Sequence, residues 1–352
     1  MRACVLHGVG DLRCEDVAVP RPGPGQVLVR VTACGVCGSD VPRIFAKGTY
    51  RFPTIPGHEF AGEIVTVGPD ADASLIGKRV TVYPLIPCRK CAACAIGAFA
   101  MCEDYDYLGS RCDGAFAEYV CAPAWNVVAV PDTVSFEEAA MTEPAAVAAH
   151  ALRQGTFSGD DSVLVFGAGP IGLLLAQWAR AWGAARVLLA DVDRRKLDFA
   201  RTLGFDRLFD ASTGDPAAWA REQTGGGADL VIEGSGASPA LEQAPMAAKV
   251  FGRVVLLGNP LGEMRLSQTA YWAILRKELT VRGTWNSSFS DLPRNEWKLT
   301  LDSMASGKID VRPLITHRVR LDELPGALAM LRDKTPFSNK VMYVNAWKKS
   351  AE

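Results

Sequence analysis

The chain has 352 residues, of which 49% are hydrophobic and 22% charged, and its formal net charge is −1. This is the composition of a globular protein long enough for two domains. The near-neutral charge gives no reason to expect nucleic acid or an anionic membrane as partner. No apolar run approaches the ~20 residues that span a bilayer. Because the first residues lack a signal peptide, we expect a cytoplasmic protein with reduced cysteines and no disulfides.

Residues 1 to about 130 predict a compact β-rich domain. Short runs typical of strands, such as "GQVLVRVTACGV" and "AGEIVTVG", are separated by Gly and Pro. The segment 135–153 then predicts a helix, with Pro144 near its start or at a kink. All ten cysteines lie before residue 122, so we expect any thiol-based metal chemistry in this part of the chain.

Four cysteines in the β-rich part have the spacing C-x2-C-x2-C-x7-C: Cys88, Cys91, Cys94 and Cys102. Four thiolates at such short spacings can close a tetrahedral zinc site and leave no open coordination position. The cluster therefore predicts a structural zinc that braces a loop, and a catalytic metal would need other ligands. The cysteines at positions 4, 14, 34, 112 and 121 are predicted to be small, buried, apolar side chains.

From about residue 160, six predicted strands alternate with helices, which indicates a parallel sheet covered on both faces. The first strand runs into G-x-G-x-x-G, formed by Gly167, Gly169 and Gly172 with Pro170 and Ile171 between the last two. This strand–turn–helix context predicts a dinucleotide site, with the phosphates at the helix N-terminus.

Cofactor choice depends on the end of the next predicted strand. Asp191 lies 19 residues beyond Gly172, where a carboxylate accepts hydrogen bonds from a ribose diol and repels a 2′-phosphate. The sequence therefore favours NAD over NADP. Arg194 and Arg195 keep NADP open, because either could pair with a phosphate.

Two further residues could hold a catalytic metal. Cys37 in "ACGVCGSD" and His58 in "IPGHEF" lie in glycine-rich loops between predicted strands. A nicotinamide enzyme that oxidises an alcohol needs a Lewis acid or a general base. The residues alone leave a metal role for this pair undecided.

The motifs "ACGVCGSD", "PGHEFAGEIVTVG", "DGAFAEY" and "FGAGPIG", together with the four-cysteine segment, resemble the zinc-dependent medium-chain dehydrogenases/reductases over nearly the whole chain. The resemblance implies an α/β fold, in which a doubly wound Rossmann domain (152–285) is inserted in a β-rich, GroES-like catalytic domain (1–151 with 286–352). It also implies that a cleft between the domains holds the nicotinamide and the catalytic zinc. A homodimer or homotetramer is expected.

The resemblance assigns roles to individual residues of the catalytic domain. Cys37 and His58 are implied as catalytic zinc ligands, and "TEPAAVAAHA" resembles the polyol-dehydrogenase branch, in which Glu143 is the third ligand. Glu59 is implied to contact the zinc-bound water or transiently the metal. Asp40 is implied to orient the histidine ligand. The Ser39 hydroxyl is implied to bond the substrate or relay its proton.

Further stretches, including "CGSDVPRIFAKG", "YDYLGSRCDGAFAEY" and "LRKELTVRGTW", resemble dehydrogenases of hexitol phosphates. They imply NAD-dependent oxidation of a secondary hydroxyl of a polyol phosphate, such as galactitol 1-phosphate, to the ketose phosphate. Arg43 and Arg111 are candidate phosphate partners. The candidates for binding substrate hydroxyls are Glu118, Trp285 and Asn286.

Two alternatives stay open. The substrate could be an unphosphorylated polyol or an amino alcohol, as in sorbitol, xylitol or threonine dehydrogenases. From a different functional class, the chain could be a catalytically silent dinucleotide-binding protein. The presence of Cys37, His58 and Glu143 argues against the silent protein.

Overall fold

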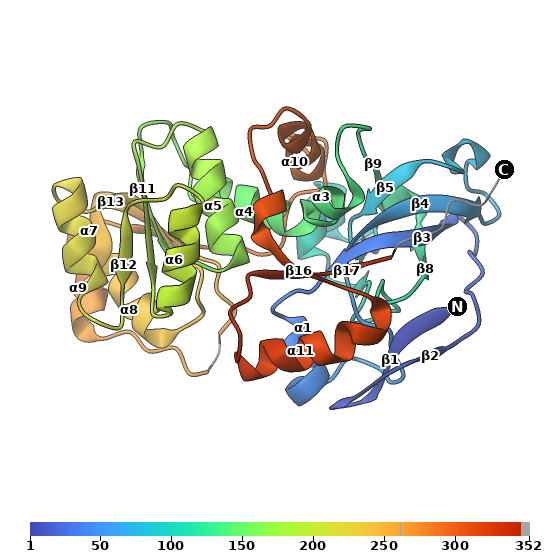
Figure 1. The fold of residues 1–352 in the computed structure, drawn as a ribbon. Helices are drawn as coiled ribbons and strands as arrows, with labels where there is room; N and C mark the ends of the chain where they lie inside the picture. The colour runs from blue at the N-terminus through green and yellow to red at the C-terminus, as the bar shows by residue number, and fades with distance from the viewer. Residues whose placement is uncertain (261, 346–352) are drawn as a thin grey trace. The chain divides into compact units, whose positions relative to one another are not determined.

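A computed structural model describes residues 1–260 and 262–345. The chain divides into two compact units, which are described separately below (Figure 1). The catalytic unit contains Met1–Glu143, Ser288–Gly307 and the chain from Val311 onward. The nucleotide unit contains Pro144–Ser287 and Lys308–Asp310. Among the described residues, no helix is both long and apolar enough to cross a membrane.

The catalytic unit is built on a seven-stranded sheet in the order β16-β17-β3-β4-β5-β9, with β8 also paired to β3. Valines and isoleucines of β3 and β4 point into its hydrophobic core, as half-buried antiparallel strands require. The strands are β3 (Gln26–Gly35), β4 (Glu59–Val67), β5 (Arg79–Val82), β8 (Tyr119–Pro123), β9 (Val127–Ala129), β16 (Ile315–Val319) and β17 (Lys340–Val344).

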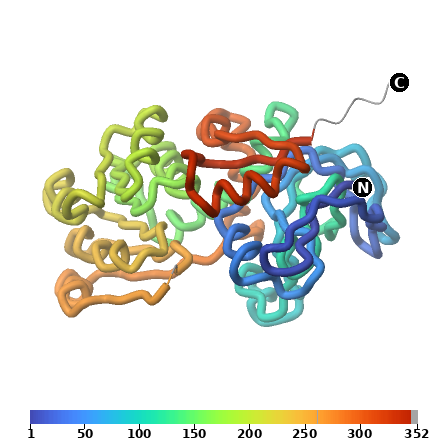
Figure 2. Tube along the Cα trace, turned by 60° about the horizontal axis from the view of Figure 1, so that its bottom comes forward, coloured from blue at the N-terminus to red at the C-terminus, as the bar shows by residue number. Residues whose placement is uncertain are grey.

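The two ends of the chain meet in this sheet. The C-terminal strand β17 pairs antiparallel with β3, and Met342 lies opposite Gly35. Figure 2 shows this C-terminal segment, coloured red, against the blue N-terminal part of the chain. The C-terminal segment thus completes the sheet to which β3 belongs. The unit's helices are α1 (Asp40–Pro42), α2 (Ala92–Ala95), α3 (Phe136–Ala140), α10 (Glu296–Ala305) and α11 (Leu324–Asp333).

A small hairpin carries the four-cysteine segment. β6 (Leu85–Pro87) pairs antiparallel with β7 (Tyr105–Tyr107), and Pro87 lies opposite Tyr105. The cysteine segment 88–102 is therefore the loop of this hairpin, which joins the two strands at one end.

The N-terminal hairpin contradicts one expectation. β1 (Arg2–Gly8) and β2 (Asp11–Asp16) place Cys4 directly opposite Cys14, and the two form a disulfide. The prediction that all cysteines are reduced, apolar side chains is therefore wrong for this pair. Each cysteine alone resembles a core residue, and only the strand register brings the two sulfurs together.

The nucleotide unit is a doubly wound parallel sheet, as predicted. Its strand order is β12-β11-β10-β13-β14-β15, and every neighbouring pair is parallel. All five residues of the central strand β10 are buried, because helices cover both faces of the sheet. The strands are β10 (Ser162–Phe166), β11 (Arg186–Asp191), β12 (Leu208–Asp210), β13 (Ala228–Glu233), β14 (Ala248–Leu256) and β15 (Thr280–Gly283).

Figure 1 shows α5 and α6 on one face of this sheet and α7, α8 and α9 on the other. α4 begins at Thr142, so Pro144 lies in its first turn, where a missing backbone N–H breaks no helical hydrogen bond. The helices are α4 (Thr142–Gln154), α5 (Pro170–Ala181), α6 (Arg194–Thr202), α7 (Pro216–Thr224), α8 (Ser238–Ala247) and α9 (Gln268–Arg276).

Candidate active site

The pairing of β3 with β4 brings three candidate metal ligands together. Gly35, the last residue of β3, lies opposite Glu59, the first residue of β4. Cys37 follows β3 and His58 precedes β4, so both lie at the same end of the strand pair. The ligand atoms of Cys37, His58 and Glu59 lie within 4.8 Å of one another. A Cβ atom at Gly35 would lie 2.3 Å from Glu59 Oε2, which explains glycine there.

Asp40 is fully buried beneath this cluster and holds the Cys37 loop. One carboxylate oxygen accepts a hydrogen bond from the backbone N–H of Cys37 at 2.9 Å. The other lies 2.7 Å from Arg43 Nη1 and 3.7 Å from His58 Nδ1. Asp40 therefore lies next to the histidine but is too far from Nδ1 for a hydrogen bond.

Glu143 lies in the first turn of α4 and is 7% exposed. Burial raises the pKa of its carboxyl to about 7, with Glu59 adding to the rise and His58 opposing it. Tyr107 Oη donates a hydrogen bond to Glu143 Oε1 at 3.4 Å. Glu143 is not one of the three residues within 4.8 Å, so its assignment as third ligand stays a prediction.

Lys340, the first residue of β17, is a buried cation that the sequence analysis missed. Its Nζ atom lies 2.5 Å from Glu59 Oε2 and 3.0 Å from the carbonyl oxygen of Val36. Burial lowers the pKa of Lys340, but Glu59 and Cys37 outweigh that effect and raise it above its ordinary value. Lys340 is therefore charged and fixes one carboxylate oxygen of Glu59.

The donor set suits a divalent cation. Burial and the charges of Glu59 and Asp40 raise the pKa of the Cys37 thiol to about 12. His58 Nδ1 is buried and makes no hydrogen bond with any described residue. A bound cation would favour the thiolate and offset the nearby carboxylates. The mixed sulfur, nitrogen and oxygen donors are those of catalytic zinc sites.

The four cysteines predicted as a structural zinc site converge. The sulfurs of Cys88, Cys91, Cys94 and Cys102 lie within 4.8 Å of one another. Backbone N–H groups point at them: that of Cys88 donates to Cys102 Sγ, and that of Glu103 is the main cause that lowers the pKa of Cys91 to about 6. Burial raises the pKa values of Cys94 and Cys102, so a bound cation would be needed to hold all four cysteines as the thiolates that bind zinc.

The glycine motif of the nucleotide unit has the geometry that a dinucleotide turn needs. Gly167 has φ of +104°, which L side chains rarely adopt. A Cβ atom at Gly172 would lie 1.8 Å from the carbonyl oxygen of Gly167, so only glycine fits. A Cβ atom at Gly169 would meet nothing within 4 Å, which leaves space for a ligand. Pro170 and Ile171 begin α5 directly after this turn.

Asp191 ends β11 beside this turn and is 7% exposed. Its carboxylate accepts hydrogen bonds from the backbone N–H groups of Ala168 and Asp193, at 2.8 and 2.9 Å. Lys196 Nζ also lies 3.3 Å from Asp191 Oδ2. These contacts tie the carboxylate to the glycine turn, and its remaining lone pairs could accept from a ribose.

The remaining residues predicted to bind substrate or relay a proton lie in different parts of the structure. Ser39 precedes α1, and its side chain makes no capping hydrogen bond. The Arg111 guanidinium lies 4.2 and 4.3 Å from the ring centroids of Tyr50 and Tyr105. The carboxylate of Glu118 accepts a hydrogen bond from the backbone N–H of Arg2 at 2.9 Å. Trp285 and Asn286 belong to the nucleotide unit and follow β15.

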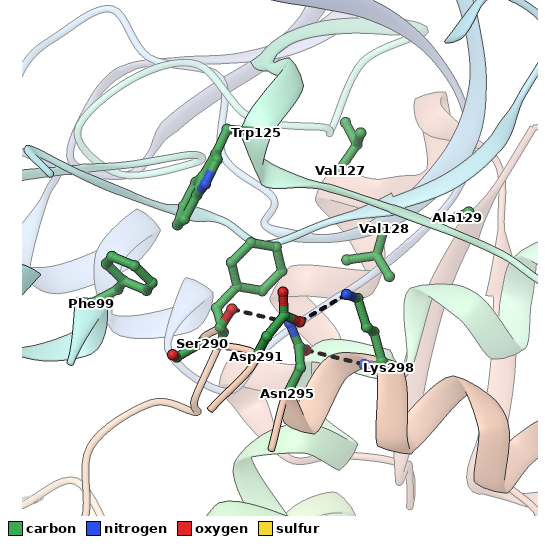
Figure 3. Close-up of a pocket in the computed structure, with 10 residues that line it drawn as sticks. Phe99, Trp125, Val127, Val128, Ala129, Ser290, Asp291, Asn295 and Lys298 are labelled. Atoms are coloured by element: carbon green, nitrogen blue, oxygen red, sulfur yellow. Dashed lines mark hydrogen bonds and ion pairs between the residues drawn. The ribbon is translucent and has the colours of Figure 1, made fainter. Parts of the chain in front are cut away.

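A cavity of about 350 Å³ lies elsewhere in the catalytic unit (Figure 3). Phe99, Trp125 and Phe289 are among its lining residues, as are Asp291 and Lys298, which form an ion pair with each other. It includes none of the predicted metal or substrate residues. We therefore assign the chemistry to the cluster around Cys37.

Comparison of the chain with known protein families identifies the family to which it belongs. Residues 23–132 match the alcohol dehydrogenase GroES-like domain, and residues 170–306 match the zinc-binding dehydrogenase domain. The chain is 34% identical to galactitol 1-phosphate 5-dehydrogenase of Escherichia coli K12, over 90% of this chain and 92% of that protein. The chain belongs to the zinc-binding dehydrogenase family. This confirms the predicted family and fold class.

The names of other similar proteins state different substrates. L-threonine 3-dehydrogenase of Pyrococcus abyssi is 35% identical over 90% of this chain and 91% of that protein. The crystal structure of E. coli galactitol-1-phosphate dehydrogenase has a TM-score of 0.92 at 33% identity, covering 98% and 100% of the two chains. An alcohol dehydrogenase from E. coli CFT073, complexed with NADH, has a TM-score of 0.88 at 28% identity, covering 98% and 99%. The chain is thus an oxidoreductase of the alcohol and polyol dehydrogenase type.

Sequence reasoning missed Lys340 and Tyr107. Both touch site residues that are distant along the chain. Tyr107 lies in the quoted stretch "YDYLGSRCDGAFAEY", but the stretch itself assigns it no role. The only signal for Lys340 is a lysine at the head of the apolar run "VMYV", where a buried strand usually has no charge.

Replacing Lys340 by Met would leave Glu59 buried without its cation. We expect the free energy of unfolding to fall by about 3–5 kcal/mol, the usual cost of breaking a buried ion pair on one side. Chemical denaturation of the purified dehydrogenase measures the change.

The matched control is the double variant Lys340→Met with Glu59→Gln, which removes both charges. It should recover most of the lost stability. If the single variant unfolds like the wild type, the ion pair does not stabilise the fold.

Proposed function

We propose that the dehydrogenase oxidises a secondary hydroxyl of a polyol phosphate to a ketose phosphate, with NAD and zinc. The observation that carries this proposal is the cluster of Cys37, His58 and Glu59, with Glu143 interacting electrostatically with all three of its members. Thiolate, imidazole and carboxylate donors in one buried site are typical of a zinc centre with an open position.

In this proposal Cys37, His58 and Glu143 hold the catalytic zinc, and the four cysteines of the β6–β7 loop hold a structural zinc. When bound, the catalytic zinc lowers the pKa of a coordinated hydroxyl, and the nicotinamide accepts the hydride. Glu59, fixed by Lys340, faces the same site and would accept a hydrogen bond from a water or substrate hydroxyl held there.

The remaining residues of the site handle protons and orientation. Ser39 has a hydroxyl that α1 does not use, so it can accept the proton of the substrate hydroxyl and pass it to solvent. Asp40 holds the backbone of Cys37 and thereby keeps its sulfur directed at the site.

We propose NAD as the cofactor, bound at Gly167, Gly169, Pro170, Ile171 and Gly172 with Asp191 on the ribose. The buried carboxylate of Asp191 disfavours a 2′-phosphate. The NADH complex of the E. coli CFT073 relative supports a nicotinamide cofactor in this fold. Lys196, which pairs with Asp191, weakens the discrimination but does not remove the carboxylate.

The phosphate of the substrate is assigned to Arg111, with Arg43 as the second cation. Two tyrosine rings hold the Arg111 side chain, and its backbone N–H donates to the carbonyl oxygen of Tyr107 at 2.9 Å. Tyr107 in turn contacts Glu143, so Arg111 lies on the loop next to the proposed metal site. Arg43 Nη1 donates a hydrogen bond to Asp40 Oδ1 at 2.7 Å.

The second candidate function is a dehydrogenase of unphosphorylated polyols or of threonine. The sequence identity to the P. abyssi threonine dehydrogenase is similar to that to the galactitol 1-phosphate dehydrogenase, and this supports the second candidate. Arg43 forms an ion pair with Asp40, so fewer cationic side chains are available to bind a phosphate, and this also fits the second candidate.

A substrate comparison tests the phosphate assignment. We expect kcat/KM for a hexitol monophosphate to exceed that for the free hexitol by about 10- to 100-fold, since a charge-assisted hydrogen bond contributes about 1.5–3 kcal/mol. NADH absorbance measures both reactions, and the same series with NADP tests the cofactor.

Arg111→Gln is the matched variant. It should lower kcat/KM for the phosphate and leave the free hexitol unchanged. Equal rates for the two substrates with wild-type enzyme would support the second candidate function.

Metal content tests the two zinc sites. We expect about two zinc ions per wild-type chain, and about one in Cys37→Ser. Cys37→Ser and Glu143→Ala should both lose turnover but bind NADH normally, because the nucleotide motif lies in the other unit. Atomic absorption and NADH fluorescence provide the measurements.

Cys91→Ser provides the comparison for the structural site. It should lower the melting temperature, because the hairpin loses its cross-link. A Glu143→Ala enzyme with normal turnover would contradict the role of Glu143.

We further propose that the dehydrogenase is a homodimer or homotetramer. β15 is an edge strand of its sheet and is exposed along its length. Large apolar side chains nearby in sequence are also exposed, among them Tyr271, Leu275 and Val281. An unpaired edge with apolar side chains favours pairing with a second copy.

Light scattering should give two or four times the 37.7 kDa chain mass. Val281→Lys, which places a charge on the edge strand, should shift the protein toward monomer. Val281→Thr is the control and should keep the wild-type mass. A monomeric wild type would contradict the proposal.

A further inference from the structure

Tyr107 contacts two residues of the proposed metal site at once. Its hydroxyl donates to Glu143 Oε1 at 3.4 Å. Its ring packs edge-to-face on the imidazole of His58, with the ring centroids 5.6 Å apart and the planes at 66°. We propose that Tyr107 is a positioning residue that orients both Glu143 and His58 for metal binding. This inference rests on the proposed function.

Each contact restricts a different ligand. A carboxylate can rotate about its last torsion, and a hydrogen bond to one oxygen directs the other oxygen elsewhere. An imidazole ring can likewise turn about its χ2 angle. An aromatic side chain packed against the ring limits this rotation. His58 Nδ1 makes no hydrogen bond with any described residue, so packing against Tyr107 is an important restraint on this ring.

The backbone of Tyr107 is itself held firmly. It pairs with Leu85 of β6, a fully buried residue. Its carbonyl oxygen accepts hydrogen bonds from the backbone N–H groups of Ser110, Arg111 and Cys112, at 3.2, 2.9 and 3.2 Å. A side chain on such a fixed backbone can hold its partners in place.

The cysteine cluster strengthens this support. β6 ends at Pro87, immediately before Cys88, and β7 begins at Tyr105, three residues after Cys102. Four sulfurs gathered around one ion would join β6 to β7, the strand that carries Tyr107. The structural site and the catalytic site are therefore linked through a single hairpin.

Zinc affinity of the full-length protein tests the proposal. We expect Tyr107→Phe, which keeps the ring and removes the hydroxyl, to bind zinc at the Cys37 site about tenfold more weakly, the usual effect of losing a partner of a metal ligand. Tyr107→Leu should lose more, because it also removes the ring from His58. Competition with a chromophoric chelator gives the affinities. The visible spectrum of the cobalt-substituted protein reports ligand geometry.

Tyr83→Phe is the matched control. Tyr83 is also a buried tyrosine next to the hairpin, and Glu143 contributes to raising the pKa of its hydroxyl. Its hydroxyl makes no hydrogen bond with any described residue. The control should keep the wild-type zinc affinity and cobalt spectrum.

Two negative results are distinguishable. If the Cys37→Ser variant contains as much zinc per chain as the wild type, the proposed function fails, and this inference fails with it. If Cys37→Ser removes one zinc but Tyr107→Phe binds it with wild-type affinity and an unchanged cobalt spectrum, only the role of Tyr107 is overturned. An equal loss of affinity in Tyr83→Phe would also overturn it, because burial of any hydroxyl would then explain the effect.

Discussion

The candidate site depends on the antiparallel pairing of three strands, β17, β3 and β4. Gly35, the last residue of β3, lies opposite Glu59, the first residue of β4, and opposite Met342, two residues after the start of β17 at Lys340, so these strand ends lie close together. Cys37, His58 and Lys340 are at or next to these ends. A one-residue slip in either register would turn Glu59 or Lys340 to the other face of the sheet. The fold thus specifies the site through register rather than through local sequence.

Charge is the second constraint on this site. Carboxylates and a thiol are buried together, and isolated buried charges are costly unless paired. Lys340 offsets Glu59, and Arg43 offsets Asp40. Cys37 has no hydrogen-bonded cation among the described residues, and burial raises its pKa, with the excess of acidic groups adding to the rise. A divalent cation would remove that excess, which is why the residues fit a metal better than a purely organic ligand.

Much of the fold and part of the site could be predicted from sequence, because their signals are local. Cysteine spacing predicted the four-sulfur cluster, and the glycine motif with its flanking strand predicted the dinucleotide turn. Lys340 could not be predicted, since it is 281 residues from Glu59 and only sheet topology brings them together. Tyr107 was hidden for the same reason, being 36 residues from Glu143. The Cys4–Cys14 disulfide required the register of the first hairpin.

The two glutamates of the site differ in their partners, and this difference bears on which one binds the metal. Glu59 has a cation in direct contact with one oxygen. Among the described residues, Glu143 accepts a hydrogen bond from a neutral hydroxyl and from no cation, and burial raises its pKa to about 7. A carboxylate already paired with lysine gains less from a second cation than one that lacks a bonded cation. Glu143 therefore gains more from a bound zinc, whereas Glu59 is better suited to act beside it. This contrast supports Glu143 as the third ligand although Glu59 lies closer to Cys37 and His58 in the structure.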